Sequence, residues 1–435
     1  MKDQAKLWVI ALSLTFCCQS CVVIENQFSA LPPGIWRAEL DLSSGGVYLD
    51  NEYKRQFSRD NKLPFLFEVV YDKPDSFHIE IINGKERIIL DDLTFGRNRA
   101  NGRDSLKLHF PVYGTYILAY FEEDVMEGRW HVPSKGQYSI PFLARHGKGD
   151  RFQHIEQDKG FNIEGKWAVT FGIEDSTGQY PAIGEFVQNE ETNEVQGTFR
   201  TETGDYRFLS GEVIGEHLWL STFDGSHAFL FKSKITSDST MTGFFKSGKH
   251  YETLWSASRS ETAELRDPDS LTIITEEELS FDFKNEEGEV INLKSGKYED
   301  KAKIIQVLGT WCPNCRDESV FLAEFYKEKP EDLEIIGVAF ERANNPREAY
   351  QAIETYVSEL GIDYDILYGG PASKSVASEK FPSLSRIIAF PTLLFLNKDN
   401  EVVRIHAGFN GPATSEFKKF KNHFYNTVES ITDAE

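Results

Sequence analysis

The chain has 435 residues, which is enough for about three domains. Its hydrophobic content of 40% and charged content of 27% are those of a folded globular protein. The formal net charge of −22 argues against nucleic acid and against anionic lipid head groups as partners of its surface.

The five cysteines lie near the two ends of the chain and leave the middle without sulfur. Cys17, Cys18 and Cys21 are close to the N-terminus, and Cys312 and Cys315 form a C-x-x-C pair. A disulfide framework therefore cannot hold the region between them together. A zinc site built from two C-x-x-C pairs is excluded because there is no second pair, and we expect no metal and no other cofactor.

The N-terminal segment has the form of an export signal. Two lysines precede an apolar run over residues 7–16, which is too short to span a bilayer. A signal that ends at a cysteine resembles a bacterial lipoprotein signal, in which this cysteine becomes the lipidated first residue. We expect residues 1–21 to be this signal and Cys21 to be the lipidated residue. A cleaved signal without lipid is the alternative, and both place the mature chain outside the cytoplasm.

Residues 30–260 have the pattern of antiparallel strands. Short runs alternate apolar and polar residues, are rich in aromatic and β-branched residues, and are separated by Gly, Asn, Asp and Pro. Examples are residues 77–81, 106–110, 116–120 and 217–220. This pattern predicts a twisted meander that curls into a barrel or half-barrel.

The β-rich region is predicted to be duplicated, with one unit over 30–140 and a second over 160–260. Three short motifs recur in the same order, namely residues 34–36 with 165–167, 64–68 with 181–185, and 126–130 with 241–245. The first pair is Gly-x-Trp in both units. Glu68 and Glu185, in the second pair, are interpreted as half-buried strand carboxylates and not as a catalytic pair.

We interpret the aromatic residues of these units as core, and the units as spacers that orient the C-terminal domain. The alternatives are a pocket for an apolar or peptide ligand and a docking surface for a redox partner. The histidines lack the spacing of metal ligands and are expected to be solvated or hydrogen-bonded. They are His78, His109, His131, His217, His227 and His250. A polar linker over 261–278 follows.

From residue 279 to 432 the pattern changes to alternating strands and helices, which is typical of an α/β domain. A hairpin is predicted over 281–293. Strands are predicted over 303–308, 333–340, 364–367, 392–396 and 401–406, and helices over 314–328, 347–360, 374–388 and 415–428. This order is a βαβ unit followed by a β-hairpin and a final helix.

The C-x-x-C pair lies where a buried strand ends and a helix begins. The unpaired N–H groups and the dipole at a helix N-terminus stabilise a thiolate, so Cys312 is expected to be the attacking sulfur. Cys315, one turn further into the helix, would resolve the mixed disulfide. A permanent short-loop disulfide is the alternative.

The stretch Gly309-Thr310-Trp311-Cys312-Pro313-Asn314-Cys315-Arg316-Asp317-Glu318, with Phe390-Pro391-Thr392 before a later strand, resembles the TlpA/ResA-type thiol–disulfide oxidoreductases of the redoxin superfamily. Residues 370–374 and 408–413 are similar to stretches of TlpA-like proteins from Bacteroidota-type bacteria. The resemblance covers residues 270–435. It implies a multi-domain chain in which a C-terminal α/β thioredoxin fold follows the antiparallel β-rich region.

The resemblance also implies roles for three further residues. Glu318 matches the family's glutamate and would accept a proton from the thiols, although an acidic residue favoured by the helix dipole is the alternative. Pro391 occupies the place of the family's cis-proline, which faces the cysteines and the bound substrate. Trp311 would line the contact surface or serve only in packing.

The activity that the resemblance implies is thiol–disulfide exchange by an enzyme of the cell envelope, lipid-anchored and facing the periplasm. Oxidised proteins such as apocytochrome c would be its substrates, and a membrane thiol electron donor would recharge it. A redoxin-type peroxidase is one alternative. A ligand-binding surface lipoprotein with an accessory redox domain is the other.

Overall fold

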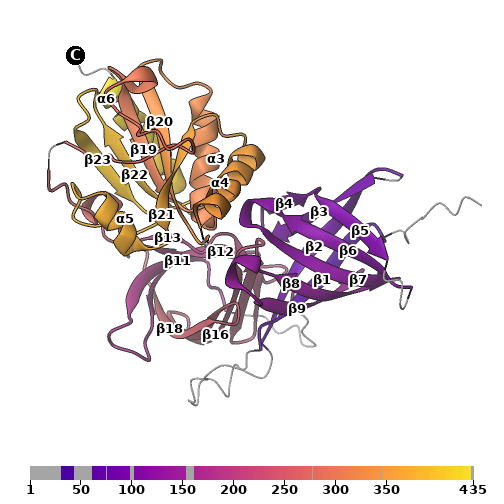
Figure 1. Cartoon of the computed structure of the whole chain (residues 1–435). Coiled ribbons are helices and arrows are strands. Elements are labelled where there is room, and N and C mark those ends of the chain that lie inside the picture. Colours follow the sequence, from indigo (N-terminus) through magenta and orange to yellow (C-terminus); the bar gives the residue numbers. More distant parts are fainter. Residues whose placement is uncertain are drawn as a thin grey trace, which may run out of the picture.

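The computed structural model describes residues 31–43, 61–74, 76–97, 102–152, 161–276, 278–343 and 345–432. They form two β-rich units followed by an α/β domain (Figure 1). We call residues 31–152 unit 1, residues 161–260 unit 2, and residues 261–432 the C-terminal domain. The expected signal and its Cys21 lie outside the described residues. Within the described part of the chain, every helix is too short or too polar to cross a membrane.

Unit 1 is one twisted antiparallel sheet. Its strands are β1 (Gly34–Asp41), β2 (Lys62–Lys73), β3 (Ser76–Asn83), β4 (Glu86–Leu90), β5 (Leu93–Arg97), β6 (Asp104–Phe110), β7 (Thr115–Glu122), β8 (Val125–His131) and β9 (Ser139–His146). The 3₁₀ turns η1 (Pro111–Tyr113) and η2 (Pro133–Lys135) lie between strands. The order β4-β3-β2-β1-β9-β8-β7-β6-β5 leaves β4 and β5 as edges, so the described sheet is an open half-barrel.

Unit 2 follows the same plan but is closed. Its strands are β10 (Gly165–Phe171), β11 (Tyr180–Gln188), β12 (Glu194–Thr201), β13 (Gly204–Asp205), β14 (Leu209–Ile214), β15 (His217–Phe223), β16 (Ala228–Ser237), β17 (Thr240–Ser247) and β18 (Tyr251–Arg259). The order is β11-β10-β18-β17-β16-β15-β14-β12-β13, and β11 also pairs with β12. Eight of these strands therefore form a closed barrel, with β13 attached to β12, and aromatic side chains fill its interior.

The two units correspond in detail, which confirms the duplication. Gly34 and Gly165 begin the first strand of each unit with φ of +99° and +109°. The indole of Trp36 donates a hydrogen bond to the Pro32 carbonyl at 3.0 Å. The indole of Trp167 donates in the same way, four residues back, to the Ile163 carbonyl at 2.8 Å. Both tryptophans are fully buried beneath the sheet.

One strand pairing distinguishes the units. In unit 2, β12 pairs with β14 from Glu194↔Glu212 to Gly197↔Leu209, and this pairing closes the barrel. The corresponding strands of unit 1 are β3 and β5, which are not neighbours in the described sheet. Unit 1 therefore has an open side that another part of the chain must cover.

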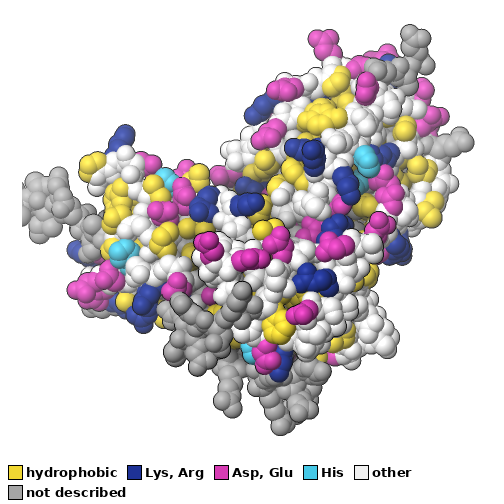
Figure 2. Space-filling view, turned by 180° about the vertical axis from the view of Figure 1, so that it is seen from behind, with side chains coloured by type: hydrophobic (Ala, Val, Ile, Leu, Met, Phe, Trp, Pro, Cys, Tyr) yellow, Lys and Arg dark blue, Asp and Glu magenta, His cyan; other side chains and the backbone are white. Residues whose placement is uncertain are grey.

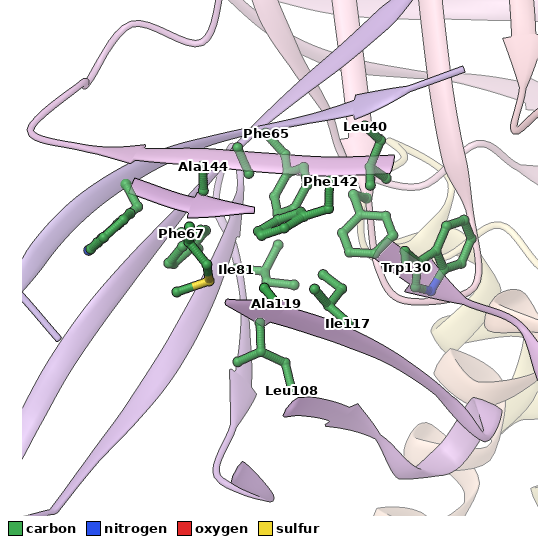
Figure 3. Close-up of a cluster of buried hydrophobic side chains, with 14 of the residues drawn as sticks. Leu40, Phe65, Phe67, Ile81, Leu108, Ile117, Ala119, Trp130, Phe142 and Ala144 are labelled. Carbon is green, nitrogen blue, oxygen red and sulfur yellow. The ribbon is translucent and has the colours of Figure 1, made fainter. Parts of the chain in front are cut away.

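Unit 2 covers the open side of unit 1. The core of unit 1, drawn in Figure 3, includes Phe223, Ala228 and Leu230 from β15 and β16. The ring of Phe223 lies 4.7 Å from that of Phe65 and 5.1 Å from that of Trp130. Its carbonyl also accepts a hydrogen bond from the buried Asn83 amide at 2.9 Å. The two units thus share the core of unit 1, while unit 2 has a second core of its own inside the barrel.

The C-terminal domain is a five-stranded sheet with helices. Its elements are β19 (Ala302–Leu308), α3 (Pro313–Tyr326), β20 (Leu333–Glu341), α4 (Pro346–Leu360), β21 (Asp365–Pro371), α5 (Lys374–Lys380), β22 (Thr392–Leu396), β23 (Val402–Ala407) and α6 (Phe417–Thr432). The sheet order is β21-β20-β19-β22-β23, with β19 parallel to β20 and antiparallel to β22. Side chains of α3, α4 and α6 pack on one face of the sheet and those of α5 on the other.

Two local predictions for this domain are wrong. The hairpin predicted over 281–293 is reduced to one bridge, Lys284↔Val290. The helix predicted over 374–388 ends at Lys380, because Pro382 disfavours helical backbone in the residue before it.

The segment predicted to be a linker is attached to the domain. It contains the 3₁₀ turn η3 (Pro268–Ser270), and a second such turn, η4 (Gly296–Tyr298), precedes β19. The Asp269 carboxylate accepts hydrogen bonds from Arg404 at 2.6 Å and pairs with His406 at 2.8 Å. These contacts hold the segment against β23.

Candidate active site

Cys312 lies at the N-terminus of α3, directly after the turn that ends β19. It is the N-cap residue of the helix, and its Sγ accepts a hydrogen bond from the Cys315 backbone N–H at 3.3 Å. Cys312 is 9% exposed, whereas Cys315 is completely buried. Both are free thiols. Of the two sulfurs, only that of Cys312 can therefore meet a substrate directly.

The surroundings separate the acidities of the two thiols. Burial raises the pKa of Cys312, but hydrogen bonds from Cys315 and from the Asn314 N–H, with the Arg342 charge, outweigh burial and bring this pKa below its usual value. Burial raises the pKa of Cys315 well above its usual value, and the neighbouring Cys312 and Glu318 raise it further. The two thiols therefore differ in acidity in the direction expected of an attacking Cys312 and a resolving Cys315.

The turn before Cys312 is fixed by β20. The Glu341 carboxylate accepts hydrogen bonds from the N–H of Thr310 at 2.9 Å and from its hydroxyl at 2.7 Å. The indole of Trp311 donates to the Phe340 carbonyl at 2.9 Å. The Arg342 guanidinium lies 3.9 Å above the Trp311 ring. This arrangement places a cation beside the sulfur of Cys312.

Pro391 lies on the other side of Cys312. The Phe390–Pro391 peptide bond is cis, as the resemblance implied. The Cys312 thiol donates to the Phe390 carbonyl at 3.5 Å, and the Phe390 and Trp311 rings meet edge to face at 5.9 Å. The turn before β22 and the turn before α3 therefore form one site.

Glu318 is a buried carboxyl behind the cysteines and not a surface acid of the first helical turn. It is 0% exposed, and one oxygen accepts a hydrogen bond from the Gln306 amide at 2.8 Å. The other oxygen, Oε1, has no hydrogen-bond partner among the described residues. Burial raises the pKa of Glu318 well above its usual value, and the charge of Cys312 adds to this effect. A carboxyl of this kind exchanges protons with a thiol more readily than an exposed one.

The structure brings the five predicted residues of this site together, namely Trp311, Cys312, Cys315, Glu318 and Pro391. Within the described ranges, no cluster of three or more His, Cys, Asp or Glu has the arrangement of a metal site.

Comparison with known proteins agrees with this geometry. Residues 275–422 match the family described as Redoxin. The C-terminal part of the chain is a redoxin domain of the TlpA/ResA thiol–disulfide oxidoreductase type. The thiol–disulfide oxidoreductase ResA of Halalkalibacterium halodurans is 28% identical over 140 residues, which are 32% of this chain and 71% of that protein.

Solved structures are similar to part of the chain. A secreted thiol–disulfide isomerase from Corynebacterium glutamicum has 22% identity and a TM-score of 0.28, and the match covers 39% of this chain and 98% of that one. A thiol–disulfide oxidoreductase from Bacteroides fragilis has 17% identity and a TM-score of 0.25, with 35% and 99% covered. The family match begins at residue 275 and does not extend into the β-rich units.

Unit 2 contacts the C-x-x-C stretch of the redoxin domain directly. The Ser226 hydroxyl donates to the Trp311 carbonyl at 3.2 Å. The Arg207 guanidinium donates to the Pro313 carbonyl at 3.2 Å. The side-chain amide of Asn314 donates to the Asp205 carbonyl at 3.2 Å. Our interpretation of the units as spacers did not include these contacts.

Arg207 joins all three parts of the molecule. Its side chain, 2% exposed, forms ion pairs with Glu86 of unit 1, with Asp224 of unit 2 at 3.2 Å, and with Asp317 of the redoxin domain at 2.6 Å. The attraction of these carboxylates outweighs burial and keeps the pKa of Arg207 well above its usual value. One buried cation thus fixes the positions of three domains around the active site.

A cavity of about 390 Å³ lies over Cys312 at the mouth of the unit 2 barrel. It is lined by Trp311, Cys312, Pro313 and Arg342 of the redoxin domain, by Tyr206, Ser226, His227, Phe229, Phe245, Ser247, His250 and Tyr251 of unit 2, and by Lys135 of unit 1. The sequence did not point to the residues from units 1 and 2. His227 and His250 have no motif spacing, and only the barrel topology places them beside a cysteine.

Glu185 also connects unit 2 to the redoxin domain. It pairs with Arg200 at 3.1 Å and accepts hydrogen bonds from the N–H and hydroxyl of Ser415 at 2.8 and 2.9 Å. This role is structural and agrees with our interpretation of Glu185 as a strand carboxylate.

Proposed function

We propose that this protein reduces disulfides outside the cytoplasm through a Cys312/Cys315 dithiol–disulfide cycle. The main support for this proposal is the position of Cys312 at the start of α3, where its Sγ accepts a hydrogen bond from the Cys315 N–H. Cys315 itself is fully buried. This difference in exposure and acidity supports one attacking and one resolving thiol.

The cycle has two steps. The Cys312 thiolate attacks one sulfur of the substrate disulfide and bonds to it, and the other sulfur leaves as a thiolate that takes up a proton. Cys315 then loses its proton to the Glu318 carboxylate and attacks the Cys312 sulfur, which releases the second substrate thiol. Two electrons pass to the substrate, and Cys312 and Cys315 become a disulfide. A thiol donor must reduce this disulfide before the next turnover.

The proposal includes a location and partners. Lipidation at Cys21 would tie the chain to a membrane of the cell envelope, with the redoxin domain facing the periplasm. A membrane thiol carrier would supply the electrons. The substrates of this protein would be disulfides in that compartment, either those formed in cytochrome c maturation or disulfides more generally.

Trapping of the mixed disulfide tests the cycle. The pre-reduced Cys315→Ser variant of the full chain should accumulate a covalent adduct with an offered disulfide, because its resolving thiol is absent. The Cys312→Ser variant should form none. Peptide mass spectrometry locates the adduct. Turnover of Cys312→Ser at the wild-type rate would refute the cycle, and turnover that requires peroxide would favour the peroxidase alternative.

A further inference from the structure

The cavity over Cys312 has an apolar floor and a polar rim that carries two cations, Lys135 and Arg342. Phe229 and Phe245, 6% and 2% exposed, form the floor together with Cys312. Lys135, His250, Tyr251 and Arg342 are exposed residues and form the rim. A ligand that enters past the rim therefore meets basic side chains first and the sulfur of Cys312 last.

The charge of the cavity differs from that of the whole protein. The net charge is −22, and the face drawn in Figure 2 carries acidic and basic side chains side by side. The residues that line the cavity include a lysine and an arginine but no aspartate or glutamate. In the described part of the chain, neither Lys135 nor Arg342 forms an ion pair with a carboxylate. The lining of the cavity therefore holds two cations and no carboxylate, while the buried Glu341 carboxyl beside Arg342 lies outside this lining.

These two cations are close to each other. Burial lowers the pKa of Lys135, and the nearby charge of Arg342 lowers it further. Arg342 uses the face of its guanidinium to stack on Trp311, which leaves the N–H groups at its edge for an acceptor. Two like charges held together in this way favour a bound anion, and a carboxylate matches the guanidinium edge in two hydrogen bonds.

The size of the cavity limits what can reach the sulfur. A volume of about 390 Å³ lies in the range of small-molecule sites. Unit 2 covers the surface around Cys312, because Ser226 bonds to Trp311, Arg207 to Pro313 and Asp205 to Asn314. A disulfide in the surface of a folded protein would have to displace these contacts, whereas a small disulfide would not.

We infer that the cavity is a binding site for low-molecular-weight disulfides that carry carboxylates, with Lys135 and Arg342 as their anchors and Cys312 as the reductant. The inference rests on the proposed function and narrows its substrate class. The reaction is the cycle given above: two small thiols leave, and Cys312 and Cys315 form the disulfide. No further oxidant takes part in a single turnover of the pre-reduced enzyme.

Single-turnover kinetics of the pre-reduced full chain test the inference. Three disulfides are compared, namely oxidised glutathione, the uncharged bis(2-hydroxyethyl) disulfide, and the interchain disulfides of insulin. We expect oxidised glutathione to react fastest. Lys135→Gln should slow this reaction about tenfold, which corresponds to the loss of one charge-assisted hydrogen bond, and should slow the reaction with the uncharged disulfide far less.

Matched variants separate binding from folding. Lys135→Arg keeps the charge and should keep the preference for oxidised glutathione. Lys73→Gln, an exposed lysine of unit 1 away from the cavity, should have no effect. Lys135 is itself exposed, so its substitution should not disturb folding. Calorimetric titration of Cys312→Ser with oxidised glutathione measures binding without reaction and should show the same loss in Cys312→Ser/Lys135→Gln.

The outcomes distinguish this inference from the proposed function. Equal rates with the charged and uncharged disulfides, or no effect of Lys135→Gln, would overturn the anionic site and leave the cycle intact. Insulin reacting as fast as oxidised glutathione would overturn the restriction to small substrates. If none of the three disulfides oxidised the enzyme, both the proposed function and this inference would be refuted.

Discussion

Replacement of Arg207 by methionine should weaken the whole assembly, because Arg207 alone among the described residues pairs with a carboxylate from each of the three parts. Its partners Glu86, Asp224 and Asp317 have side-chain exposures of 12%, 1% and 14%. Methionine keeps much of the side-chain volume, so the variant tests the charge and not the packing. Breaking a buried ion pair costs about 3–5 kcal/mol when one charge is left behind.

The structure places the expected loss at the lower end of this range. Glu86 and Asp317 keep some contact with water and can recover solvation. Asp224 cannot, but it still accepts the N–H groups of Ser226 at 2.9 Å and His227 at 2.6 Å, and the His227 ring lies 3.4 Å from its other oxygen. We therefore expect Arg207→Met to lower the free energy of unfolding by about 3 kcal/mol, chiefly because the buried Asp224 carboxylate loses its arginine.

Urea unfolding of the full chain, followed by circular dichroism and by alkylation of the buried Cys315, measures this loss. Arg266→Met is the matched control, since Arg266 binds Glu202 through two hydrogen bonds of 2.6 Å but is 66% exposed. Its loss should be much smaller than that of Arg207→Met, because water and salt screen an exposed ion pair. Adding Asp224→Asn to Arg207→Met should restore part of the stability. If Arg207→Met costs no more than Arg266→Met, the argument from burial is refuted.

Two further predictions concern Glu318 and Phe223. Glu318→Gln should slow resolution of the mixed disulfide about 100-fold at pH 7, because Cys315 loses its base. In a pH–rate profile, the rate of resolution in Glu318→Gln should keep rising with pH toward the raised pKa of Cys315. Glu324→Gln, at an exposed position of the same helix, should behave as wild type. Phe223→Ala should lower the free energy of unfolding by about 3–5 kcal/mol in urea titration, because it leaves a cavity in the shared core. Val187→Ala is the control, since Val187 is 65% exposed and its loss should be small. Equal losses for the two variants would contradict the shared core.

The sequence was sufficient for several elements whose pattern is local. The strands over 77–81 and 106–110 alternate with period two, and the C-x-x-C pair follows a run that the structure buries completely in β19. Glu318 lies one helical turn beyond Cys315, so its spacing placed it on the same face. These features depend on neighbours within a few residues and could be predicted from them.

The closure of unit 2 and its contact with the active site depend on distant residues. The pairing of β12 with β14 distinguishes a barrel from a half-barrel, yet unit 1 has the same motifs in the same order. Arg207 follows an unremarkable Gly-Asp-Tyr stretch, and its partners are 121, 17 and 110 positions away by their residue numbers. Such contacts leave no periodic signal in the sequence of either partner.

The shared core has a consequence for how the duplicated units have diverged. Phe110 ends β6 and Phe223 ends the corresponding β15, and their rings meet at 5.6 Å. The turns after them also join, since the Thr115 hydroxyl donates to the Gly225 carbonyl at 2.6 Å, and Gly225 has φ of +88° with no room for a side chain beside Phe110. Val112 of the first turn packs on the redoxin domain, and Ser226 of the second binds Trp311.

The two copies are therefore no longer interchangeable. Unit 2 is closed and presents its mouth to Cys312, whereas unit 1 is open in its described sheet and encloses Phe223 of unit 2. If the two units exchanged places in the chain, the open sheet of unit 1 would face the cysteines, and the closed barrel of unit 2 would have no opening to enclose a side chain of its neighbour. The two units of the duplicated region therefore share one fold but have different structural roles.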